Sequence, residues 1–334
     1  MSLIQNQSLL FRAVEETQPG EAWLGLFHAF WPSYRRWYLQ SGDAARPYYL
    51  PCVRALREHM PELMPTYETL VNLAGGGDLE ARFLSLFCPP PYVAACSQAV
   101  WSGEHPVLVR NYDYPAQLCE GVVLKTTWNG RQVMGVSDCL WGLLDGMNED
   151  GLAVSLSFGG RRDVGDGFGV PLVLRYVLET CTTTAEATAA LARIPVHMSY
   201  NVTVVDRTGE FATVYVAPGK PGDIRRTAAA TNHQHKIEWH QHASATATVE
   251  RHRRLLLMLQ DSELSADTLI GAFLKPPIYS TAFSRGFGTL YSAAYWPTMG
   301  RADFFWPGMS WPQSFAHFTP GERLIQFGEP QIQT

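Results

Sequence analysis

A cysteine followed by three prolines, Cys88-Pro89-Pro90-Pro91, divides the chain into two parts with different hydrophobic periodicity. Proline has no backbone N–H and fixes φ, so three consecutive prolines end any helix. Before this segment, apolar side chains from Glu21 to Gln40 recur at intervals of three and four residues, which predicts an amphipathic helix. Beyond it, apolar and polar residues alternate, which is typical of strands. We therefore expect a helical N-terminal segment followed by a strand-rich core.

The same periodicity arguments predict the remaining elements. Helices are expected at 51–60, 61–73 and 78–87 before the prolines, and at 170–181, 184–192, 246–260 and 266–274 after them. Strands are expected at 92–100, 106–112, 121–127, 132–137, 152–158, 200–205, 211–216 and 224–230, with a strand-like tail over 289–327. Because strands and helices come in runs rather than in strict alternation, we predict an α+β fold.

The composition is that of a globular protein and excludes several classes of function. Of the 334 residues, 46% are hydrophobic and 17% are charged, and the net charge is only −5. Without a basic stripe, nucleic acid is not an expected partner. No apolar run reaches the roughly 18 residues of a membrane span, and Met1 to Gln18 lacks a signal-peptide pattern. The six cysteines have no C-x-x-C spacing, so we expect reduced thiols and a cytoplasmic location.

One cysteine, Cys96, lies in the first predicted strand after the prolines and has charged residues on the next strand. A turn near 102–104 would fold Arg110 and Asp113 back towards the thiol. A nearby guanidinium lowers the pKa of a thiol and favours the nucleophilic thiolate. A nearby carboxylate can orient a protonated partner. The residues alone leave a second interpretation open, in which Cys96 is a small buried hydrophobic side chain.

Four segments follow one another in a recognisable order and spacing. They are Ala95-Cys96-Ser97, Arg110-Asn111-Tyr112-Asp113, the ten residues from Gly146 to Ser155, and Thr231-Asn232-His233. In these segments the chain resembles the acyl-coenzyme A:6-aminopenicillanate acyltransferase family, N-terminal-nucleophile hydrolases related to choloylglycine hydrolases and penicillin V acylases. The resemblance implies a four-layer αββα sandwich over 96–334. It also implies that 1–95 is a helical pro-segment, or small chain, packed on that core.

The resemblance also implies a way of activating Cys96. The thiol attacks the Ala95 carbonyl, and autoproteolysis between Ala95 and Cys96 then exposes the Cys96 α-amine. An α-amine has a pKa of about 7.7 to 8.0, so it can act as the base for its own thiol near neutral pH. Small residues, Ala95 and Ser97, stand where members of the family carry glycine and threonine.

The remaining site residues are likewise implied by the resemblance. Asn232 corresponds to the oxyanion donor, and Asp113 would hold the Cys96 amine or thiol. Arg110 would fix Asp113 or a substrate carbonyl, while Arg251 and Ser157 are candidates for substrate binding. From the residues alone, Asn232 could equally be a turn residue and Arg251 part of a solvated charge run.

The implied activity is that of a cysteine amidohydrolase or acyltransferase acting on a linear amide or acyl substrate. The implied partner is a small acyl or amide molecule, with an acyl-coenzyme A donor as a further candidate. No cofactor is needed for this chemistry. Association into a homo-oligomer is left open by the sequence.

Two other interpretations compete with this one. Four histidines lie within ten residues, namely His233, His235, His240 and His242, with Glu238 between them. Each H-x-H pair would face one side of a strand, which is a usable ligand spacing for a metal-dependent hydrolase. The segment is polar, however, and is more typical of a loop. The third interpretation is a non-catalytic binding protein on the same scaffold.

Overall fold

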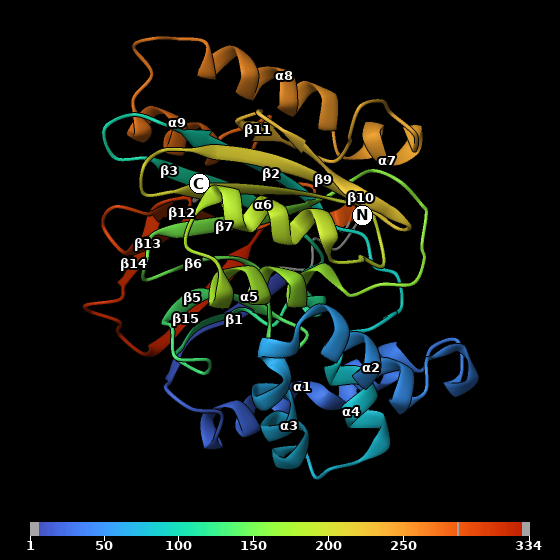
Figure 1. Ribbon diagram of the computed structural model, residues 1–334. Helices are drawn as coiled ribbons and strands as arrows, with labels where there is room; N and C mark the ends of the chain where they lie inside the picture. The colour runs from blue at the N-terminus through green and yellow to red at the C-terminus, as the bar shows by residue number, and fades with distance from the viewer. Residues whose placement is uncertain (1–6, 286, 329–334) are drawn as a thin grey trace.

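A computed structural model of the protein describes residues 7–285 and 287–328. The first six residues of the predicted 1–95 segment lie outside the described residues, as do the last six of the predicted core. Two β-sheets lie face to face, and each carries helices on its outer face (Figure 1). A group of helices from the N-terminal segment lies at one end of this sandwich.

Among the described residues, the sheets have nine and six strands. In spatial order the larger sheet contains β10 (Lys220–Arg225), β9 (Phe211–Ala217), β8 (Tyr200–Asp206), β7 (Leu152–Phe158), β6 (Gly142–Asn148), β5 (Val133–Asp138), β4 (Val122–Thr126), β1 (Gln7–Glu16) and β15 (Gly321–Phe327). The smaller contains β11 (Ala229–Ala230), β2 (Ala95–Trp101), β3 (Val107–Asp113), β12 (Thr289–Trp296), β13 (Arg301–Trp306) and β14 (Met309–Ser314). The strand pairs are antiparallel except β1 with β4, which are parallel.

The central strands are buried on both faces because sheet and helix cover them from opposite sides. Every residue of β7 is buried, and this strand packs against β2 of the other sheet. Helices α5 (Val170–Thr180) and α6 (Thr184–Arg193) cover the outer face of the larger sheet. Helices α8 (Thr248–Leu259) and α9 (Ala266–Phe273) cover the smaller sheet. The predicted four-layer αββα order is therefore confirmed.

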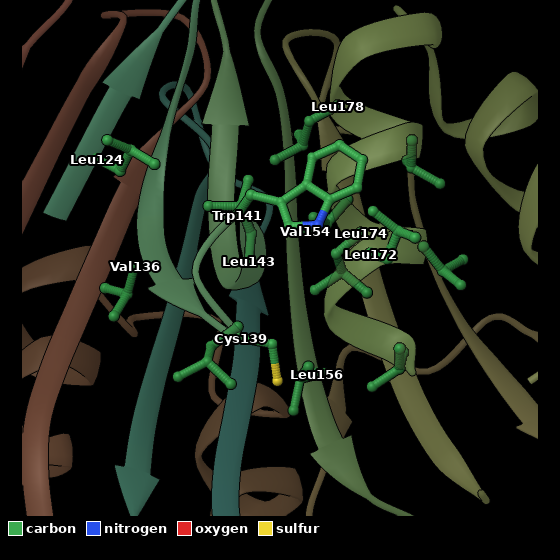
Figure 2. Close-up of a cluster of buried hydrophobic side chains, with 14 of the residues drawn as sticks. Leu124, Val136, Cys139, Trp141, Leu143, Val154, Leu156, Leu172, Leu174 and Leu178 are labelled. Carbon is green, nitrogen blue, oxygen red and sulfur yellow. The ribbon is translucent and has the colours of Figure 1, made fainter. Parts of the chain in front are cut away.

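Trp141 anchors the apolar layer between the larger sheet and α5. Figure 2 shows its ring among Val154, Leu172, Leu174 and Leu178, and its side chain is fully buried. Its indole Nε1 donates to the carbonyl of Leu84 at 2.9 Å. Because a buried indole N–H needs an acceptor, this bond ties the N-terminal helices to the core.

The N-terminal segment is largely helical, as predicted, with one exception. Its helices are α1 (Glu21–Tyr38), α2 (Tyr49–His59), α3 (Met64–Leu73) and α4 (Asp78–Leu84). Residues 7–16, however, form β1, which lies inside the larger sheet between β4 and β15. In this strand only Phe11 and Ala13 are buried, so its sequence carries little apolar alternation. The N-terminal segment thus supplies a strand to the core sheet.

Three further elements differ from the sequence prediction. β6 was not predicted, and the short helix α7 (His240–Ala245) occupies a segment expected to be a loop. The single strand predicted at 224–230 is divided between β10 and β11, which belong to different sheets.

In the part of the chain that the structure describes, no helix combines the length and the apolar character needed to cross a bilayer. All six cysteines are free thiols.

Candidate active site

The β2–β3 hairpin brings Cys96 and Arg110 together, as the sequence predicted. Its register pairs Cys96 with Tyr112 and Gln98 with Arg110. The Nη2 atom of Arg110 lies 3.3 Å from the Cys96 sulfur, and both side chains are fully buried. The thiol therefore has a fixed cationic donor next to it.

Arg110 is held in place by a buried carboxylate that the sequence did not identify. Asp145, on β6, forms an ion pair with Nη1 of Arg110, and both side chains have no exposed surface. The same carboxylate accepts hydrogen bonds from the hydroxyls of Tyr291, at 2.6 Å, and Tyr295. The Leu144 carbonyl accepts from Nη1 at 3.1 Å. Several hydrogen bonds thus compensate the desolvation of this ion pair, which fixes the guanidinium beside the sulfur.

The main-chain atoms of Cys96 are also held by predicted site residues. Its backbone N–H donates to Oδ1 of Asn232 at 2.9 Å. Its carbonyl accepts from Nη1 of Arg251 at 2.8 Å. Together with the contact to Arg110, three side chains hold the nitrogen, oxygen and sulfur of Cys96.

Arg251 connects the members of this cluster. Nη1 also lies 2.7 Å from the Ser97 hydroxyl and 3.2 Å from Asp113 Oδ2, while Nη2 donates to Asn232 Oδ1 at 2.8 Å. Only 1% of Arg251 is exposed, so it does not belong to a solvated charge run. Its Nε also donates to the Thr246 carbonyl at 2.7 Å, so the whole guanidinium is fixed by hydrogen bonds within the cluster and to the C-terminal end of α7.

Burial dominates the titration of the site. It raises the pKa of the Cys96 thiol to about 11, although the charge of Arg110 opposes this shift. Arg110 acts in the expected direction, but the expectation of a thiol pKa below its ordinary value is wrong, because desolvation penalises the thiolate more than Arg110 stabilises it. Burial likewise raises the pKa of Asp113 to about 6 against the charge of Arg251. Thr289 donates to the other Asp113 oxygen at 2.7 Å.

The oxygen and the nitrogen of the Asn232 side-chain amide make different contacts. The oxygen accepts from Cys96 and Arg251, as described above. The Nδ2 group has one long contact, 3.3 Å to the Phe158 carbonyl. The backbone N–H of Asn232 donates to the Thr248 hydroxyl at 2.7 Å, which fixes the residue from α8. The amide donor is therefore the more weakly bound end of a well-anchored side chain.

Ser157 lies one layer away from the nucleophile and supports the Asn232 segment. Its hydroxyl donates to the Thr231 carbonyl at 2.8 Å. Asn201, which sequence reasoning missed, donates to that carbonyl at 2.7 Å and to the His233 carbonyl at 3.1 Å. Both side chains are fully buried polar groups on the facing sheet. A polar residue inside an otherwise apolar strand is the signal that could have identified Asn201.

The four histidines of the competing interpretation have separate surroundings. His235 pairs with Asp223 at 2.8 Å, whereas the His233 ring faces His252. His242 packs against the ring of Trp239 and is buried. Within residues 7–285 and 287–328, no group of three or more His, Cys, Asp or Glu side chains is arranged to hold a metal ion. The arrangement of these donors gives the metal-dependent interpretation no support.

Comparison with known proteins identifies one matching family model. It is described as acyl-coenzyme A:6-aminopenicillanic acid acyl-transferase and matches residues 101–311, which is well over half of the chain. The matched region contains Arg110, Asp113, Asn232 and Arg251, and it begins just after Cys96. No curated protein sequence matches the chain.

Similar solved structures include three from different organisms. The N-acylethanolamine-hydrolyzing acid amidase ortholog of Caenorhabditis elegans has 15% identity and a TM-score of 0.46, over 61% of this chain and 93% of that one. Penicillin V acylase from Agrobacterium tumefaciens has 17% identity and a TM-score of 0.44, over 69% and 86%. A mutant conjugated bile acid hydrolase from Clostridium perfringens has 13% identity and a TM-score of 0.40, over 70% and 97%.

Proposed function

Because the chain belongs to the acyl-coenzyme A:6-aminopenicillanic acid acyl-transferase family, we propose that it is an amidohydrolase or acyltransferase with Cys96 as its nucleophile. One observation carries this proposal. The nitrogen, carbonyl oxygen and sulfur of Cys96 are each held by one of three buried side chains, Asn232, Arg251 and Arg110. A cysteine that only filled space in the core would need no polar partner at its sulfur.

Maturation begins at the bond between Ala95 and Cys96. The Cys96 sulfur attacks the Ala95 carbonyl carbon, the C–N bond breaks, and the nitrogen takes the thiol proton, which leaves a thioester. Water then cleaves the thioester, so that Ala95 ends in a carboxylate and Cys96 regains its thiol with a free α-amine. The N-terminal segment, 1–95, stays attached to the 96–334 core through β1 and the packed helices.

In the mature enzyme the α-amine activates the Cys96 thiol. At a pKa of about 7.7 to 8.0, it takes the thiol proton as the sulfur attacks the substrate carbonyl and returns it to the departing amine. Asn232 Oδ1 already holds that nitrogen, and Nδ2 leaves its long contact with Phe158 to donate to the oxyanion. Arg110 stabilises the developing thiolate, while Asp113 and Arg251 keep the amine and Asn232 in position.

The substrate class can be tested directly with the compounds named in the descriptions of the similar solved structures. Purified protein is incubated with an N-acylethanolamine, penicillin V and a conjugated bile acid, and the released amine and acid are quantified. A parallel reaction contains an acyl-coenzyme A and 6-aminopenicillanic acid, because the family description names that transfer.

Ser157 supports the Asn232 segment, so we expect Ser157→Ala to act through KM and stability more than through kcat. With six free cysteines, a reduced cytoplasmic setting suits the enzyme.

Turnover of any amide in the panel, with loss in Cys96→Ala, supports the proposal. Release of acid and amine without a coenzyme A donor assigns a hydrolase, and transfer to the added amine assigns an acyltransferase. Turnover that is abolished by a chelator and retained by Cys96→Ala would contradict it.

Asp113 should give the pH–rate profile a limb on the acid side, in which the rate falls as the pH is lowered. Its pKa is raised to about 6, so the carboxyl is ionised above that pH and neutral below it. When it is neutral, Arg251 loses its anionic partner and the amine loses its orienting charge. Protonation of the α-amine already lowers kcat/KM below about pH 8, and we expect Asp113 to add a further fall of about tenfold per pH unit below roughly pH 6. The rate–pH profile of Asp113→Asn should be lower throughout and lack this limb; an unchanged limb would assign it to another group.

A further inference from the structure

A cavity of about 500 Å³ lies between α1 and the core. Aromatic rings form much of its wall. Tyr34 and Trp37 come from α1, Tyr92 follows the three prolines, and Tyr114 follows β3. The ring centroids of Tyr34 and Trp37 are 6.1 Å apart, as are those of Trp37 and Tyr92. The N-terminal segment and the core thus build this cavity jointly.

Two carboxyl groups line the same cavity. The Tyr34 hydroxyl lies 2.5 Å from Glu120 Oε1 and 3.2 Å from Asp138 Oδ1. Glu120 also accepts from the Leu140 backbone N–H at 2.7 Å, and only 3% of its surface is exposed. The two acids are therefore close together in a largely apolar setting. Burial raises the pKa of both carboxyls, that of Asp138 to about 7.

These two acids differ from three other buried acids of the core. Asp113, Asp145 and Glu179 each face a buried arginine. Arg285 also lines the cavity, but within the described residues neither Glu120 nor Asp138 has a Lys, Arg or His nitrogen within 4.0 Å. Two carboxyls without a cation are costly in the interior of a protein. A ligand that brings the missing positive charge would relieve that cost.

The cavity adjoins the active site through short stretches of chain. Tyr92 and Val93, in its wall, lie just before the Ala95–Cys96 bond, and Tyr114 directly follows Asp113. The Tyr114 ring lies 5.4 Å from that of Tyr112, which in turn lies under the Arg110 guanidinium at 5.0 Å. The cavity thus lies beside the chain segments that carry Cys96 and Asp113.

We propose that this cavity is the specificity pocket of the enzyme and takes a substrate portion with an apolar or aromatic body and a protonated amine, which binds Glu120 and Asp138. Aromatic faces attract organic ammonium groups, and carboxylates pair with them, so both parts of the wall favour the same ligand. A neutral acyl chain would fill the aromatic part and leave the acids without a cation. This proposal rests on the proposed function, because the cavity is a substrate pocket only if Cys96 is the nucleophile.

The direct test compares two probes of similar shape, phenethylamine, which is protonated at pH 7, and the neutral 2-phenylethanol. Binding of each to the purified protein is measured by calorimetric titration. We expect the amine to bind at least about tenfold more tightly than the alcohol, since a cation interacts favourably with both the aromatic rings and the carboxylates. In Glu120→Gln and in Asp138→Asn this preference should fall to about threefold or less. Both variants keep an oxygen acceptor for Tyr34, which favours a folded protein, and circular dichroism checks it.

Glu104→Gln, an exposed position on the β2–β3 turn, is the matched control and should keep the full preference. Equal binding of amine and alcohol to the wild type, no saturable amine binding, or an undiminished preference in both carboxyl variants would overturn the proposal. Cys96→Ala separates this proposal from the proposed function. It should bind the amine like the wild type while losing turnover. If Cys96→Ala instead retained turnover, the nucleophile would be wrong while the amine preference still stood.

Discussion

Replacing Cys96 by alanine should lower kcat by about 10⁴-fold or more and should also prevent cleavage after Ala95. The sulfur forms the bond to the substrate carbonyl in our account, and no second nucleophile lies within hydrogen-bond reach of Arg110 Nη2 and Asn232 among the described contacts. Rates are measured on whichever amide of the panel is turned over, and cleavage is followed by denaturing gel electrophoresis.

Cys52→Ala is the matched control for this change. Cys52 is fully buried in α2, so the substitution removes a sulfur of the same kind from a part of the chain outside the active site. Both its turnover and its cleavage should persist. Cys96→Ser should cleave slowly, because a hydroxyl can undergo the same acyl shift with a weaker nucleophile. Amidase activity retained in full by Cys96→Ala would show that another residue is the nucleophile.

Removal of the Asn232 amide donor should lower kcat by about 10²- to 10³-fold, with little change in KM. An oxyanion donor acts mainly in the transition state, so its loss affects kcat more than substrate binding. Asn232→Asp isolates this role, because the carboxylate keeps an oxygen for the Cys96 nitrogen and for Arg251 but has no N–H to donate. Its charge would also repel the oxyanion, so we expect a loss at least as large as in Asn232→Leu.

Measurements of kcat, KM and melting temperature on cleaved protein distinguish this role from a structural one. A residue needed only for the turn before α7 would tolerate aspartate, and its loss would lower the melting temperature while kcat stayed near normal. If Asn232→Asp kept most of its turnover, Asn232 would not be the oxyanion donor.

Local sequence signals predicted most of the fold. The prolines at 89–91 mark the start of the strand-rich core, and period-two patterns located most of its strands. β1 was missed because only two of its residues, Phe11 and Ala13, are buried, so burial leaves little alternation in the sequence. β6 was missed for a different reason: its sequence contains Gly142, Asp145, Gly146 and Asn148, residue types that are depleted in strands. In both strands, tertiary packing decides the conformation.

The candidate site was predictable only where its residues are close in sequence. The β2–β3 hairpin pairs Arg110 with Gln98, two residues from Cys96, so the Arg110 side chain can reach the sulfur. Asn232 and Arg251 come from more than a hundred residues away, so only the family resemblance pointed to them. Asp145 and Asn201 lie in buried strands, and their role follows from hydrogen bonds that no local pattern encodes.

The direction of the Cys96 pKa shift shows why the neighbouring charge alone was misleading. A guanidinium 3.3 Å from the sulfur favours the thiolate, but complete burial disfavours it more strongly. This result makes the free α-amine more important, because within the described residues no side-chain base lies within hydrogen-bond distance of the Cys96 sulfur. Cleavage before Cys96 is thus the step on which the proposed mechanism depends.

Intact-mass analysis of freshly purified, active protein tests that step most directly. Cleavage before Cys96 divides the 334 residues and 37.3 kDa of the chain into pieces of 95 and 239 residues, with masses in proportion of about 10.6 and 26.7 kDa. The two pieces should elute together in gel filtration, because β1 lies between β4 and β15. The larger piece should begin with the sequence from Cys96 onwards. A single species of 37.3 kDa in protein that turns over amides would contradict the account.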